Sequence, residues 1–142
     1  MSTCFAVVNG VKQGGVLSPV LFCVYFDGLL YKLMKAGHYG CYRPMGYTFV
    51  GVLAYADDVV LLAPSANAMR KMLRLCDDFA SDFDVKFNAN KLKCIVFKPH
   101  CSHLPTTNLG FQIGGNETEI VDMWLHLGHI ITNRCDDDAA VI

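Results

Sequence analysis

The chain has 142 residues, of which 53% are hydrophobic and 18% are charged, and its formal net charge is −1. This length suggests one domain or a piece of one, and the apolar fraction is sufficient to fill a core. The composition excludes a disordered or low-complexity chain. It also excludes a membrane span, because the longest nearly apolar stretch, residues 16–26, is shorter than the roughly 20 residues that a span needs.

Basic residues are concentrated in residues 1–100, which hold 11 Lys and Arg against 7 Asp and Glu, whereas residues 101–142 hold 1 against 6. This excess is compatible with contact to nucleic-acid phosphates. The seven cysteines are scattered without a Cys-x-x-Cys pair. Their irregular spacing and mostly apolar surroundings predict reduced core thiols in an intracellular protein of the cytoplasm or nucleus, and the N-terminus shows no secretory signal pattern.

The first predicted element is a helix after a glycine pair. Ser18 and Pro19 form a helix-start signal with Ser18 as the capping hydroxyl, and the helix should run to about Ala36. Residues 20–26 are apolar on every side of this helix. Its first two turns are therefore expected to be buried.

The next predicted element is a hairpin in residues 51–64, GVLAYADDVVLLAP, which places Asp57 and Asp58 inside an apolar run. Two β runs, 47–54 and 59–63, flank the acidic break, and both are apolar on both faces, as in strands covered on each side. The break lacks the favoured Asn-Gly or Asp-Gly, so strain is expected at the turn. Because burying an unpaired carboxylate is costly, the two aspartates must reach the surface or meet a positive charge.

The second predicted helix covers residues 66–83 and is opened by Pro64-Ser65, with an apolar stripe at helical spacing on one face. Short strands are predicted at 85–88, 92–98, 111–113 and 124–131, with a loop at 100–110 and a turn at 114–116. The stretches HCSH (100–103) and HLGH (126–129) match no structural zinc spacing. We interpret their histidines as loop and strand residues.

Four stretches, in chain order, resemble the palm of a reverse transcriptase, most closely that of non-LTR (LINE-type) retrotransposons. They are GVKQGGVLSP (10–19), YADD (55–58), FNANKLKCIVF (87–97) and WLHLGHII (124–131). YADD alone recurs by chance, whereas the Gln-Gly-Gly-x-x-Ser-Pro block is much more specific. The resemblance implies an α+β fold, a fragment of a right-hand polymerase palm with helices packed on an antiparallel sheet. It makes residues 1–142 a partial reverse transcriptase domain with palm motifs over 10–131.

The resemblance implies nucleotidyl transfer of dNTPs onto a DNA primer 3′ end along an RNA template, with Mg²⁺ or Mn²⁺ ions clamping the attacking and leaving oxygens. Asp57 and Asp58 would be the catalytic, metal-binding carboxylates, with Asp57 the main ligand, and metal would be the positive charge that they meet. By the same resemblance, the nucleotide- and template-binding residues would be Gln13, Gly14, Gly15, Tyr55 and Lys91. Leu127 and Gly128 would shape the loop that grips the primer.

Each of these roles has a simpler alternative. The aspartates can be solvated on an ordinary hairpin tip, and the glycine pair can be a plain turn before a capped helix. Tyr55 can lie at the core edge, and Lys91 can be a solvated lysine at a strand end. Leu127-Gly128 can be a structural hairpin turn.

The chain also departs from the family pattern. The family needs a further catalytic aspartate from an upstream strand, and the nine residues before Gly10 contain no Asp or Glu. Fingers and thumb are missing too. We therefore expect a very poor polymerase on its own, with an unpaired sheet edge and exposed apolar faces beside the hairpin. The alternatives are a non-catalytic module that binds nucleic acid or a partner through that edge, and a retroelement remnant without a present role.

Overall fold

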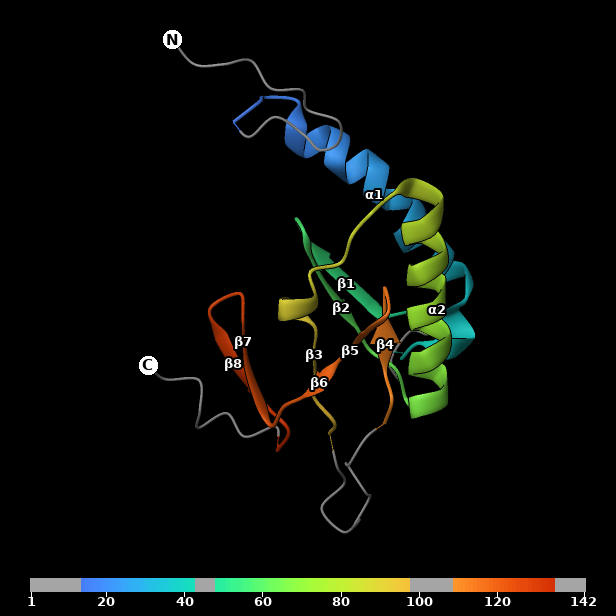
Figure 1. Cartoon of the computed structure of the whole chain (residues 1–142), viewed down its shortest axis with the longest axis vertical. Coiled ribbons are helices and arrows are strands. Elements are labelled where there is room, and N and C mark those ends of the chain that lie inside the picture. Colours follow the sequence, from blue (N-terminus) through green and yellow to red (C-terminus); the bar gives the residue numbers. More distant parts are fainter. Residues whose placement is uncertain (1–13, 43–47, 98–108, 135–142) are drawn as a thin grey trace. The chain divides into compact units, whose positions relative to one another are not determined.

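The computed structural model describes residues 14–42, 48–97 and 109–134 (Figure 1). Its elements in chain order are α1 (Ser18–Lys35), the 3-10 helix η1 (Gly37–Tyr39), β1 (Val52–Tyr55), β2 (Asp58–Leu61), α2 (Ala66–Phe83), the 3-10 helix η2 (Ala89–Lys91), β3 (Lys93–Cys94), β4 (Gln112–Ile113), β5 (Asn116–Glu117), β6 (Glu119–Ile120), β7 (Met123–His126) and β8 (His129–Thr132). The chain divides into two units, Met1–Pro64 and Ser65–Ile142.

The described residues form a mixed α+β fold, which confirms the predicted class. The strands form four two-stranded sheets, β1-β2, β3-β6, β4-β5 and β7-β8, where one antiparallel sheet was predicted. The β3-β6 pair is parallel and the other three are antiparallel.

Helix α1 starts and ends close to the predicted residues, but its start has a different cause. Leu17 occupies the cap position without a side-chain capping hydrogen bond, and Ser18 is already helical. The Ser18 backbone N–H donates to the Gly15 carbonyl at 3.1 Å. A backbone turn therefore precedes the helix, and the prediction of Ser18 as the cap was wrong. Proline in the first turn is confirmed.

The first two turns of α1 are exposed, so the prediction that they are buried was wrong. Val24 is 71% exposed, whereas Phe26, Leu29 and Leu33 are buried on one face further along the helix. An apolar helix surface is buried only where another element covers it. In the described part of this unit, α1 contacts β1 of the neighbouring hairpin.

The β1-β2 hairpin forms where it was predicted, with register from Val52↔Leu61 to Tyr55↔Asp58. Its strands are shorter than the predicted runs 47–54 and 59–63. They are not covered on both faces either, because Leu53 is 52% exposed and all of β2 is only half-buried. Among the described residues, apolar surface on this hairpin is therefore exposed.

A close backbone approach anchors the base of this hairpin. The Cys41 N–H donates to the Leu62 carbonyl at 3.2 Å, and the Leu62 N–H donates to the Gly51 carbonyl at 2.8 Å. A Cβ on Gly51 would lie 2.7 Å from the Cα of Gly40, which is closer than real Cβ contacts. Only glycine fits this position, because the two backbones pack directly against each other.

Helix α2 has the predicted bounds and the predicted start signal. The Ser65 hydroxyl accepts a hydrogen bond from the Ala68 N–H at 3.2 Å, as an N-terminal cap does. Met72, Cys76 and Phe79 are buried on one face, which confirms the apolar stripe. Burial, with a smaller contribution from the Asp77 carboxylate, raises the pKa of the Cys76 thiol to about 12. Cys76 is therefore an uncharged core thiol, as predicted. The same prediction is wrong for Cys23, which is exposed on α1, where no described element covers it.

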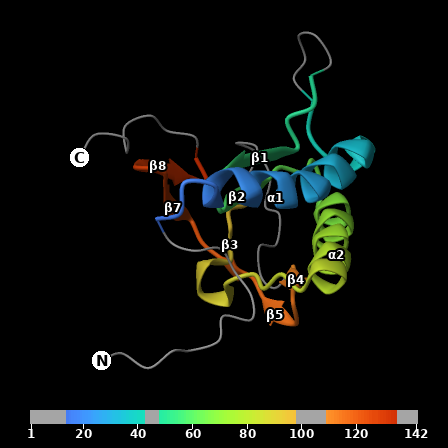
Figure 2. The same ribbon diagram turned by 90° about the horizontal axis from the view of Figure 1, so that it is seen from above.

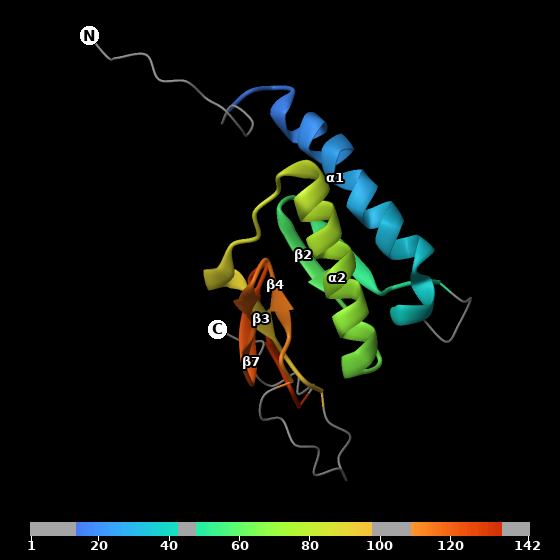
Figure 3. The ribbon, with the colours of Figure 1, turned by 45° about the vertical axis from the view of Figure 1, so that its right-hand side comes forward.

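The strand β4 packs beside α2 (Figure 2, Figure 3). Phe111 and Ile113 are buried there. Asp77 accepts a hydrogen bond from the Gly114 N–H at 2.6 Å, and the Arg70 guanidinium donates to the Leu109 carbonyl at 2.8 Å. The first hydrogen bond joins the β4-β5 turn, predicted at 114–116, to the helix, and the second joins the segment before β4 to it.

The strand predicted at 85–88 is wrong. Asp84 ends α2 in a left-handed conformation with φ 51°, and the Val85 N–H still donates to the Ala80 carbonyl. The segment that follows is irregular until η2. The strand predicted at 92–98 shortens to β3, and the stretch 124–131 is the β7-β8 hairpin.

Candidate functional site

The acidic pair lies at the tip of the β1-β2 hairpin. Ala56 and Asp57 form a two-residue turn, and Asp58 is the first residue of β2, paired with Tyr55. Asp57 and Tyr55 are exposed, and Asp58 is half-buried. Adjacent residues within a strand point to opposite faces of the sheet. Asp57 belongs to the turn and not to a strand, so both carboxylates can face a common site at the tip of the hairpin.

The turn is strained, as predicted. Ala56 has φ 50°, a left-handed conformation that costs an L-residue with a Cβ about 1–2 kcal/mol. The favoured residues for such turns are Gly, Asn and Asp. Strain of this kind gathers at functional sites, and here it lies next to the two carboxylates.

The donor set fits magnesium in part. Mg²⁺ takes one or two carboxylates together with waters and substrate phosphates, and two carboxylates are present at the tip. Nowhere in the described ranges do three or more His, Cys, Asp or Glu side chains gather as a metal site. Because the tip reaches the surface, solvent also satisfies these charges, so the apolar run tolerates them with or without metal.

The glycine pair lies before α1. Gly14 has φ +78° and would place a Cβ in open space, with no atom within 4 Å. A ligand can approach this backbone closely. The Gly15 carbonyl accepts from the Ser18 N–H, so the pair also forms the turn into the helix. Gln13 lies outside the described residues.

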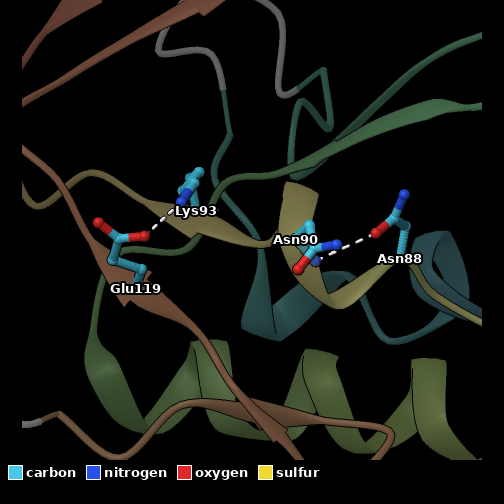
Figure 4. Close-up of polar contacts among 4 residues, drawn as sticks. All are labelled: Asn88, Asn90, Lys93 and Glu119. Atoms are coloured by element: carbon cyan, nitrogen blue, oxygen red, sulfur yellow. Dashed lines mark hydrogen bonds and ion pairs between the residues drawn. The ribbon is translucent and has the colours of Figure 1, made fainter.

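Lys91 lies in the second unit, at the end of η2, where a strand end was the simpler expectation. The Asn88 side chain accepts from the Asn90 N–H at 3.1 Å (Figure 4), and the Asn88 carbonyl accepts from the Lys91 N–H at 3.0 Å. The Asn-x-x-Lys spacing therefore has a local cause, because Asn88 organises the turn that presents Lys91. Lys91 is exposed.

Sequence reasoning missed Lys93, two residues later. Its ammonium pairs with the Glu119 carboxylate (Figure 4) and lies 5.6 Å from the centroid of the Trp124 ring. These contacts link β3 with β6 and β7. Only the strand pairing brings the three residues together, so no local signal could have found them.

Leu127 and Gly128 form the two-residue turn between β7 and β8. Both have positive φ, 49° and 82°, as tight hairpin turns require. The structure thus contains the hairpin, while a role in gripping a primer stays a prediction. His126 and His129 flank the turn as strand residues, and the stretch 100–103 lies outside the described residues.

The glycine turn with its helix, the acidic hairpin tip and the asparagine-organised lysine turn follow one another along a stretch of the sequence that matches a known family. The profile of the family "Reverse transcriptase (RNA-dependent DNA polymerase)" matches residues 3–113. The chain belongs to this family, which confirms the resemblance seen in its motifs.

Its curated relatives come from retrotransposons. The chain is 32% identical over 132 residues to the Retrovirus-related Pol polyprotein from type-2 retrotransposable element R2DM of Drosophila melanogaster. It is 28% identical over 126 residues to the corresponding polyprotein from type-1 retrotransposable element R2 of Nasonia vitripennis. These matches cover 87% and 84% of this chain and 12% of each relative. No solved structure matches the chain.

The chain is thus homologous to Pol proteins of R2 non-LTR retrotransposons and spans about an eighth of their length. Among the described residues, neither helix is both long and apolar enough to cross a membrane.

Relief of the strain at Ala56 can be tested by substitution. We expect Ala56→Gly to raise the free energy of unfolding by about 1 kcal/mol, because glycine adopts positive φ without a Cβ clash. Ala54→Gly, two residues earlier in β1, is the matched control and should lower it by about 0.5–1 kcal/mol. Urea denaturation of both variants measures the difference. Equal destabilisation by the two variants would contradict a strained turn.

Proposed function

We propose that this chain is a palm segment of a retrotransposon reverse transcriptase, in which Asp57 and Asp58 hold divalent ions for nucleotidyl transfer. The observation that supports this most directly is the two-residue turn, which puts both carboxylates at one exposed hairpin tip inside the family-matched stretch. The dNTP, DNA primer and RNA template would be its substrates.

When bound, Mg²⁺ or Mn²⁺ would stabilise the negative charge on the transferring phosphoryl group. Asp57, exposed in the turn, is the main ligand, and Asp58, half-buried at the start of β2, is the second. The pairing of β1 with β2 fixes the backbone positions of both aspartates, so their carboxylates need little rearrangement to bind a divalent ion.

The remaining residues contact substrate in this proposal. The Tyr55 ring, 67% exposed beside the aspartates, offers a flat surface to the sugar at the primer end. Gln13, Gly14 and Gly15 border the nucleotide and template, since the open backbone at Gly14 admits close approach. Lys91 brings a positive point charge to the leaving pyrophosphate. The Leu127-Gly128 turn grips the primer.

Activity in this proposal belongs to a longer protein. The chain spans 12% of its curated relatives, and most nucleic-acid affinity comes from contacts spread along the phosphate backbone. We therefore expect the chain alone to extend a primer very poorly.

A chimera tests the proposal. Residues 10–131 replace the matching stretch of a family member with measured RNA-dependent DNA polymerase activity, and extension of a DNA primer on an RNA template is followed with Mg²⁺. We expect extension by the chimera and almost none by the chain alone. A chimera that folds and binds primer-template but does not extend would overturn the proposal.

A non-catalytic role in binding is the second candidate, favoured by one observation. Val16, Leu17 and Val24 of the first helical region are 93%, 68% and 71% exposed, an apolar surface suited to a partner. Salt-dependent retention of RNA, or capture of a partner, without extension in the chimera would favour this candidate.

A further inference from the structure

The β7-β8 hairpin brings two histidines together. His126 ends β7 and His129 begins β8, and the two are direct cross-strand partners. Cross-strand partners have Cβ atoms about 4.5–5.5 Å apart and point to the same face of the hairpin. The tight turn formed by Leu127 and Gly128, both at positive φ, connects the two histidines directly. The spacing in the sequence alone, His-Leu-Gly-His, does not show this pairing.

Both imidazoles are available as ligands. Within the described ranges, neither ring makes a hydrogen bond or an ion pair, and His129 is exposed while His126 is half-buried. Imidazole nitrogen binds borderline divalent ions such as Zn²⁺ and Ni²⁺ at about 2.0–2.1 Å, and a cross-strand pair can reach one ion from two sides.

We propose that His126 and His129 form a two-imidazole binding site for a borderline divalent transition-metal ion, with water completing its coordination. This site differs in chemistry from the carboxylate tip of β1-β2, whose oxygens suit Mg²⁺. An ion held by both imidazoles joins β7 to β8 beside their turn. The proposal does not depend on polymerase activity.

The fluorescence of Trp124 can report binding of a metal ion at this site. Trp124 is the single tryptophan of the chain, and it lies two residues before His126 in β7. Residues two apart in a strand share a face and are separated by about 6.8 Å. Ni²⁺ bound by the histidine pair should therefore quench Trp124 fluorescence, whereas ions bound far away should not.

The test is a fluorescence titration of the full chain with Ni²⁺ at neutral pH under reducing conditions. We expect saturable quenching, and none with Mg²⁺ at the same concentrations. His126→Gln and His129→Gln should each raise the half-quenching concentration at least about tenfold, because each removes one of two protein ligands. His38→Gln, in η1 of the other unit, is the matched control and should leave it unchanged.

A second control concerns the thiol of Cys94 in β3. Cys94 of β3 follows Lys93, whose side chain contacts Trp124, so a thiol-bound ion could also quench. Cys94→Ser should not change the titration. Loss of quenching in Cys94→Ser, or equal half-quenching concentrations in wild type and His129→Gln, would overturn the two-imidazole site.

Discussion

Replacing Asp57 by asparagine in the chimera is expected to lower Mg²⁺-dependent primer extension by about 10²–10³-fold, the range found when one main stabiliser of transition-state charge is removed. Asparagine keeps the size and the turn preference of aspartate, so the β1-β2 hairpin should persist. The loss should appear mainly in kcat, because the carboxylate acts on the reacting phosphoryl group and contributes little to primer-template binding. Single-turnover extension separates an effect on the chemical step from an effect on primer-template binding.

Two matched variants decide whether this loss is specific. Asp58→Asn should cost less than Asp57→Asn, because Asp58 is the second ligand in the proposal. Asp78→Asn lies on the exposed face of α2 and removes the same charge elsewhere, so it should leave extension unchanged. If Asp57→Asn and Asp78→Asn behave alike, the hairpin tip is not the catalytic site.

Replacing Phe79 by alanine is expected to lower the free energy of unfolding by about 3–5 kcal/mol. Phe79 is 0% exposed, and its ring stacks on Phe83 with centroids 4.5 Å apart. The substitution leaves a cavity on the buried face of α2. Since small domains have only about 5–15 kcal/mol of stability, this is a large fraction of the total. Urea denaturation followed by circular dichroism measures it.

Phe83→Ala is the matched control, because Phe83 is 42% exposed and its substitution therefore removes less buried apolar surface. It should cost clearly less than Phe79→Ala. If Phe79→Ala does not fold, Phe79→Leu should still fold and lose less than about 1.5–2 kcal/mol, because leucine fills most of the volume. Equal losses in Phe79→Ala and Phe83→Ala would contradict the described packing of α2.

Sequence reasoning succeeded where the signals are local. The bounds of α2 followed from the Ser65 cap and an apolar repeat that returns to one face every three or four residues. The acidic hairpin followed from two β runs around a polar break, and its strain followed from the absence of Asn-Gly or Asp-Gly. These features depend on residues a few positions apart, so the amino-acid sequence by itself determined them, together with the family.

Other features needed the tertiary structure. The all-round apolar start of α1 predicts burial, but burial requires a covering surface, and Val24 has none among the described residues of its unit. The β3-β6 pair and the Lys93–Glu119 contact join residues 26 apart in the chain. The direct facing of His126 and His129 depends on a register that the spacing alone leaves open. Such contacts are decided only when distant segments pair, because their free energy comes from mutual burial and hydrogen bonding that no short stretch contains.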